Sequence, residues 1–146
     1  MLKRSEKDRP SSMSDWPRWL QEDLATNSFN GCVGSVLVSE SSRARVWHIS
    51  LKPGERLPFH RHVLDYLWTT TSAGQARSYY EDGRMIETEY KVGDTAHLNF
   101  GDGEHMLHDI TNIGETELGF VTVEFLESAN EPLPLPEAVR LRREAA

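Results

Sequence analysis

The sequence has little cysteine, no long apolar run and fewer basic than acidic residues, and each shortage excludes a class of protein. Cys32 is the only cysteine in 146 residues, so neither an internal disulfide nor a cysteine-built zinc cluster is expected. The net charge of −7 would repel nucleic acid and anionic membranes. No run approaches the roughly 20 apolar residues of a membrane span. Because the first residues are charged and form no signal core, we expect a cytoplasmic protein without nucleic-acid or membrane partners.

Short extended runs separated by turns dominate the middle of the chain. The stretch Arg45 to Leu51 alternates apolar and polar residues, and Asp82-Gly83 is typical of a hairpin turn. Many short strands with frequent turns indicate an all-β sandwich or barrel rather than alternating strands and helices. The expected strands cover residues 33–39, 45–51, 59–71, 75–80, 85–90, 95–100, 106–111 and 118–125.

The two ends of the chain differ from the middle and are predicted to be arms of a single barrel domain. Residues 1–12 are charged and poor in apolar side chains, which predicts disorder. A short helix is predicted from Asp15, which would cap it, with Pro17 in its first turn. Three prolines after residue 131 predict an extended tail. The predicted organisation is an N-terminal arm with a short helix over 1–32, a barrel over 33–128 and a Pro-rich tail over 129–146.

Two histidines stand two apart in the stretch Phe59-His60-Arg61-His62. On a strand, residues i and i+2 point to the same face, so the two imidazoles would project into one space. Paired imidazoles suit a divalent metal ion, although an isolated pair is more often a surface or core feature. Metal binding becomes the stronger interpretation because Gly54 marks a turn before the pair and His108 lies in a later extended run.

These residues resemble the two sequence motifs of the small single-domain cupins. Gly54 is followed after five residues by His60-Arg61-His62, as in the first motif. His108 is followed after three residues by Asn112, as in the second motif. The resemblance covers residues 33–126 and implies an all-β fold, a cupin jelly-roll β-barrel, here with a short N-terminal helix and an extended C-terminal arm.

The resemblance also implies one divalent metal ion, and Fe, Mn, Ni, Zn or Cu would suit it. Its ligands would be His60, His62 and His108, with His105 as the alternative third ligand or as an acid–base group at the mouth. The glutamate that normally follows the histidine pair is missing. Either a bulge brings Asp65 to the metal, or three histidines bind it with Tyr66 nearby as a hydrogen-bond donor.

As a function, the resemblance implies a metal-dependent oxidoreductase of the dioxygenase type acting on a small organic acid or carbonyl compound. The chain is similar to small cupins linked to β-alanine or amino-acid catabolism. One alternative is a metal-dependent isomerase or lyase with Tyr66 or His105 as proton carrier, and another is a non-catalytic cupin that binds a small ligand. A homodimer is expected because small cupins commonly pair and the apolar N-terminal arm would otherwise be exposed.

Overall fold

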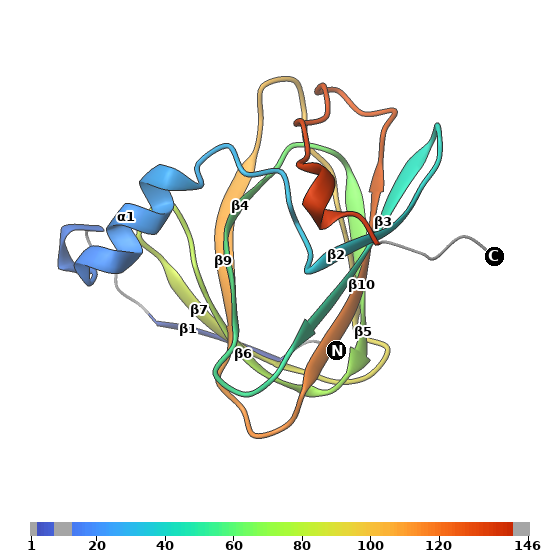
Figure 1. The fold of residues 1–146 in the computed structure, drawn as a ribbon. Helices are drawn as coiled ribbons and strands as arrows, with labels where there is room; N and C mark the ends of the chain where they lie inside the picture. The colour runs from blue at the N-terminus through green and yellow to red at the C-terminus, as the bar shows by residue number, and fades with distance from the viewer. Residues whose placement is uncertain (1–2, 8–12, 142–146) are drawn as a thin grey trace.

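The computed structural model describes residues 3–7 and 13–141 and shows two facing β-sheets with one helix outside them (Figure 1). The strands of the described residues form two five-stranded sheets, the first in the order β1-β7-β6-β9-β4 and the second in the order β2-β3-β10-β5-β8. The elements are β1 (Lys3–Lys7), η1 (Met13–Asp15), α1 (Arg18–Thr26), β2 (Val36–Glu40), β3 (Ala44–Leu51), β4 (Arg56–His62), β5 (Tyr66–Ser72), β6 (Gly74–Tyr79), β7 (Met85–Tyr90), β8 (Thr95–Leu98), β9 (Met106–Asn112), β10 (Leu118–Phe125) and η2 (Glu137–Val139).

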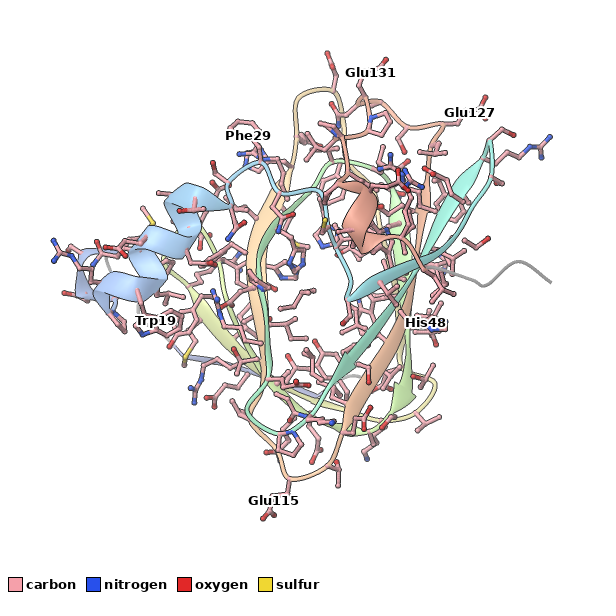
Figure 2. All side chains as sticks on the ribbon, viewed as in Figure 1. Trp19, Phe29, His48, Glu115, Glu127 and Glu131 are labelled. Atoms are coloured by element: carbon pink, nitrogen blue, oxygen red, sulfur yellow. The ribbon has the colours of Figure 1, made fainter. Side chains whose placement is uncertain are left out.

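Alternating strand positions direct apolar side chains into the space between the sheets. On β3, Trp47, Ile49 and Leu51 are buried while His48 and Ser50 are exposed, as the sequence alternation predicts. Figure 2 shows His48 on the outer side of the second sheet. The two sheets therefore share one core and leave their outer faces to other contacts.

Helix α1 packs on the outer face of the first sheet. Trp16 and Leu20 contact Phe59 and Leu107 there, and the rings of Trp16 and Phe59 stack with their centroids 5.9 Å apart. Burial of each large apolar side chain stabilises the fold by about 1.5–3 kcal/mol, which holds a helix too short to be stable alone. At nine residues α1 cannot cross a membrane, and no other helix in the described part of the chain is long and apolar enough to do so.

The structure differs from the sequence prediction in three segments. The predicted helix cap is wrong, because Asp15 lies in η1 and α1 begins at Arg18 with Pro17 as its N-cap and no side-chain hydrogen bond there. Within the range predicted to be disordered, Lys3–Lys7 forms β1, which pairs antiparallel with β7, and the remainder of that range lies outside the described residues. Residues 59–71, predicted as one strand, belong to β4 and β5, which lie in different sheets. Residues 63–65 separate them, because the backbone there turns from one sheet to the other. This crossing brings Tyr66, at the start of β5, opposite His62, at the end of β4.

Candidate metal centre

The three histidines project from the inner faces of two neighbouring strands of the first sheet. On β4 and β9, His60 pairs with His108. The register of β4 shifts between Leu57 and His60, which is a bulge that contains Pro58. A proline suits this position because it has no N–H to contribute to the ladder. The bulge lets Leu57, His60 and His62 all point into the barrel, where each is buried.

The three imidazoles converge closely enough to share one ion. One ring nitrogen of each of His60, His62 and His108 lies within 4.8 Å of the other two. The Nε2 atoms of His62 and His108 are 3.3 Å apart. Two nitrogen ligands that are each about 2.0–2.1 Å from one ion lie roughly 2.8–3.4 Å apart, from octahedral to tetrahedral angles. The observed separation therefore fits a shared metal ion.

All three imidazoles are in the neutral form that binds metals. His60 Nδ1 is 2.8 Å from the carbonyl oxygen of Pro58, and because a carbonyl only accepts, Nδ1 donates and Nε2 keeps its lone pair. Burial lowers the pKa of His60 to about 4. Burial also lowers the pKa values of His62 and His108 well below the usual 6.5, and the neighbouring histidines lower them further. None of the three has an imidazolium proton to lose near neutral pH before it binds a metal.

Two polar atoms of this cluster lack partners. The Nδ1 atoms of His62 and His108 are buried without a hydrogen-bond partner among the described residues. Buried polar side-chain atoms are paired in the large majority of cases, so unpaired ones mark a functional site or a missing partner. No carboxylate or thiol from residues 13–141 joins the three histidines. Three neutral nitrogen donors with open positions fit a divalent transition metal such as Fe, Mn, Ni, Zn or Cu.

Tyr66 faces the histidines from the second sheet. Its ring stacks on His62 with the centroids 4.1 Å apart and the planes 12° from parallel. Burial raises the pKa of the Tyr66 phenol well above its usual 10, so the hydroxyl keeps its proton. The sequence prediction also has Tyr66 pointing inward, because it counts two-residue alternation from His62 along one continuous strand. The structure places it inward from β5, on the opposite side of the cavity.

The structure does not bring Asp65 and His105 to the three histidines. Asp65 Oδ1 accepts a hydrogen bond from the Phe100 N–H at 2.8 Å, which holds the turn between β4 and β5 against a neighbouring loop. His105 Nε2 is 2.5 Å from a carboxylate oxygen of Glu81. Of the two arrangements that the missing glutamate leaves open, this geometry favours three histidines with Tyr66 nearby, because no bulge turns Asp65 inward.

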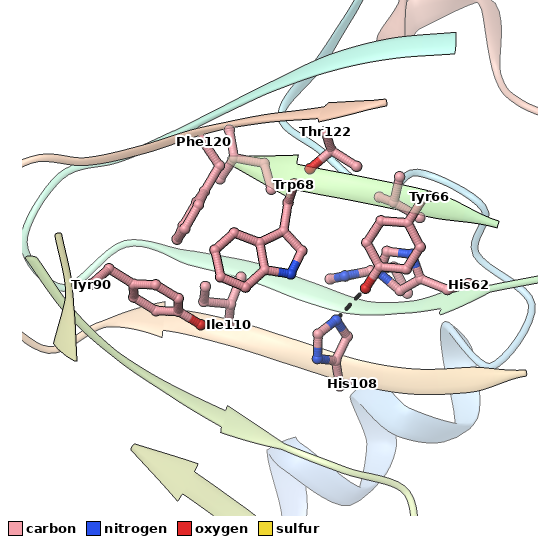
Figure 3. Close-up of a pocket in the computed structure, with 11 residues that line it drawn as sticks. His62, Tyr66, Trp68, Tyr90, His108, Ile110, Phe120 and Thr122 are labelled. Atoms are coloured by element: carbon pink, nitrogen blue, oxygen red, sulfur yellow. Dashed lines mark hydrogen bonds between the residues drawn. The ribbon is translucent and has the colours of Figure 1, made fainter. Parts of the chain in front are cut away.

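A cavity of about 50 Å³ lies between the sheets beside the histidines (Figure 3). His62, His108 and Tyr66 gather at one end of it. At the other end are the rings of Trp68, Tyr90 and Phe120, which meet edge to face with centroids 4.8 to 5.7 Å apart. Alternation along β5, β7 and β10 directs these three residues inward, but it does not reveal that their rings meet.

On the outer faces of the same strands, Arg56 joins α1 to β9. Its guanidinium contacts Asp23 at 2.9 Å and Asp109 at 2.8 Å. Asp109 is fully buried and also accepts a hydrogen bond from the Tyr79 N–H at 2.7 Å. Burial raises the pKa of Asp109, and its hydrogen bonds oppose that shift. The sequence analysis missed this cluster because its partners are 33 and 53 residues apart and form no local pattern.

Comparison with known proteins supports the fold. No family model and no curated protein sequence matches the chain. A cupin domain from Bordetella pertussis is 23% identical with a TM-score of 0.53, over 60% of this chain and 85% of that one. A protein with a double-stranded β-helix domain from Klebsiella pneumoniae is 28% identical with a TM-score of 0.50, over 64% of this chain and 76% of that one. Both likenesses cover most of the other protein and agree on the two-sheet barrel.

Proposed function

Since this chain is a small cupin by its fold, we propose that His60, His62 and His108 bind one divalent metal ion and that the loaded protein is an oxidoreductase of the dioxygenase type. Its substrate would be a small organic acid or carbonyl compound. One observation carries the proposal: three neutral imidazoles converge at the end of a cavity, two of them with Nε2 atoms 3.3 Å apart. The expected homodimer and cytoplasmic location stay predictions.

The bound ion would supply a Lewis-acidic, redox-capable centre with positions free for O2 and substrate. The chain would supply orientation and proton control. The hydrogen bond between His60 Nδ1 and the Pro58 carbonyl fixes the His60 ring with Nε2 toward the site. Tyr66 holds a phenol proton beside His62, where it can donate to a substrate oxygen. Asp65 and His105 have no part in this proposal, since both hydrogen-bond to groups elsewhere.

Metal content tests the binding site. Protein purified without added metal is expected to carry close to one ion per chain by elemental analysis. The double variant His60→Ala/His62→Ala should lose it. The matched control is His48→Ala/His97→Ala, which removes two exposed histidines from the outer face of the second sheet. Full metal content in the His60/His62 variant would refute the site.

Oxygen consumption tests the reaction type. Iron-loaded protein with a panel of small organic acids and carbonyl compounds should take up O2 only when a substrate is present. The His60→Ala/His62→Ala variant should show no such uptake. Stoichiometric metal together with no O2 uptake across the panel would reject the dioxygenase assignment while leaving the metal site intact.

A further inference from the structure

We infer that the cavity takes a small monoanion, with one anionic oxygen-bearing end at the histidines and a short apolar end against the aromatic rings. This inference rests on the proposed metal site and narrows its substrate class. It comes from the chemistry of the cavity wall, which has histidines at one end and aromatic rings at the other.

The histidine end would carry uncompensated positive charge once a divalent ion is bound. An imidazole binds a metal as a neutral ligand, and no Asp or Glu lines the cavity. The nearest acidic neighbour in sequence, Asp65, has its carboxylate on the Phe100 backbone. The inner carboxylate of Glu124, opposite Tyr66 on β10, accepts a hydrogen bond from Trp47 Nε1 and does not line the cavity. A ligand that brings one negative charge to this end offsets the charge of the ion in a buried setting. Because the glutamate of the motif is missing, an anionic oxygen of the substrate would offset the charge of the ion in its place.

The other end offers no cation to pair with a second negative charge. Trp68, Tyr90, Ile110 and Phe120 form its wall, and no Lys or Arg lines the cavity. Figure 3 shows Tyr90 and Phe120 on the side away from His62, with Trp68 between them and Tyr66. A second carboxylate or a phosphate placed there would lose its water and gain no cation. Dicarboxylates and phosphorylated compounds are therefore poor ligands, and an alkyl group is a good one.

The volume limits the apolar end to a short chain. The cavity holds about 50 Å³. A buried apolar cavity of about 150 Å³ is what admits a benzene ring in a well-studied case. The whole cavity, with its histidine end included, is about a third of that. The apolar end therefore favours a short alkyl group over a phenyl ring.

Three probes that share one end test this inference by calorimetry on zinc-loaded protein, because zinc binds without redox turnover. The probes are 2-oxopentanoate, 2-oxoglutarate and benzoylformate, which carry the same 2-oxo acid group and end in a methyl, a carboxylate and a phenyl ring. We expect 2-oxopentanoate to bind at least about 100-fold more tightly than 2-oxoglutarate, since an unpaired buried charge costs more than two tenfold steps in affinity. We expect it to bind more tightly than benzoylformate as well, because the phenyl ring needs more space than the propyl group. Equal or tighter binding of 2-oxoglutarate or benzoylformate, or no binding of 2-oxopentanoate, would overturn the inference.

A pair of variants tests the wall directly. Tyr90→Arg places a cation at the apolar end and should narrow the preference for 2-oxopentanoate over 2-oxoglutarate by at least about tenfold. Val92→Arg adds the same charge two residues along at a position that is 68% exposed, and should leave the preference unchanged. A preference that shifts equally in both variants would contradict the assignment. If Tyr90→Arg does not fold, the three-probe comparison still decides.

The proposed function and this inference fail in different ways. If the protein binds no zinc, or if the His60→Ala/His62→Ala variant keeps its zinc, the proposed metal site is refuted. If the protein binds zinc through the histidines but prefers 2-oxoglutarate, only the inferred preference for a monoanion is refuted.

Discussion

Strands β4 and β9 carry a polar cluster on each face, and the two clusters differ in how their polar atoms are satisfied. On the outer face, Arg56 bridges Asp23 and Asp109, and each carboxylate also accepts a backbone N–H, from Phe59 at 3.0 Å and from Tyr79 at 2.7 Å. On the inner face, three neutral imidazoles have no counter-ion, and two Nδ1 atoms lack partners among the described residues.

This difference separates a structural cluster from a site that can bind something. A buried polar cluster whose members are all paired holds its elements in one arrangement. One with unpaired members costs stability and is retained where it has a ligand. The outer cluster ties α1 to the two strands that carry the histidines, so it can keep the inner cluster in place while that cluster remains incomplete. The predictions below test whether the two faces behave in these two ways.

The largest stability effect is expected on the outer face. Asp109→Ala removes a fully buried carboxylate that pairs with Arg56, and should lower the free energy of unfolding by about 3–5 kcal/mol. Urea denaturation measures this. The control is Arg18→Ala, which breaks an exposed pair with Glu22 on α1 and should cost at most about 0.5 kcal/mol. Similar losses in the two variants would mean that the outer cluster does not hold the strands.

Glu124 is an inner carboxylate that does have a partner, and it should make stability depend on pH. It accepts a hydrogen bond from Trp47 Nε1 at 2.8 Å, and burial raises its pKa from the usual 4.5 to about 7. The folded state holds this proton up to about pH 7, whereas the unfolded chain releases it at the lower, usual value. The contribution of Glu124 to the free energy of unfolding therefore falls as pH rises through this window, by about 3 kcal/mol in total.

Glu124→Gln keeps an acceptor for Trp47 and removes the titration. Urea denaturation at about pH 5 and about pH 8 should show that the variant is more stable than the parent at the higher pH and loses most of this dependence. An unchanged difference between the two pH values in Glu124→Gln would assign the dependence to other groups.

On the inner face, a metal should add stability because it binds the folded protein through the three converging imidazoles. Zinc at about 100 times its dissociation constant should raise the free energy of unfolding by about 2.7 kcal/mol. His108→Ala should abolish this gain, whereas Asp109→Asn should keep the gain even though its starting stability is lower. Denaturation with and without zinc measures both. A zinc-dependent gain that survives in His108→Ala would detach metal binding from the three histidines.

Much of the inner face could be predicted from the sequence, and little of the outer face. His60 and His62 share a face through two-residue alternation, and His108 follows from motif spacing, because both are local patterns. The positions of Asp65 and Tyr66 depend on the turn that moves the chain from β4 to β5, and a continuous pattern of extended residues over 59–71 does not show it. Arg56 and Asp109 meet only after β4 and β9 pair, so no local spacing marks them.

The smallest effect is expected for His105, which lies outside both clusters. Its partner is the carboxylate of Glu81, and both side chains are partly exposed. An ion pair of this kind contributes about 0–1 kcal/mol. His105→Ala should therefore keep full metal content by elemental analysis and lose at most about 1 kcal/mol of stability. A substantial loss of metal in His105→Ala would place this residue at the site after all.

X-ray absorption at the edge of the bound metal tests the three-histidine centre most directly, because it reports the number and type of ligand atoms. A three-histidine centre should give scattering from three imidazole nitrogens at about 2.0–2.2 Å from the metal, with oxygen ligands in the remaining positions. One imidazole signal should disappear in His108→Ala. A sulfur ligand, fewer than three imidazoles in the parent protein, or a spectrum unchanged by that substitution would contradict it.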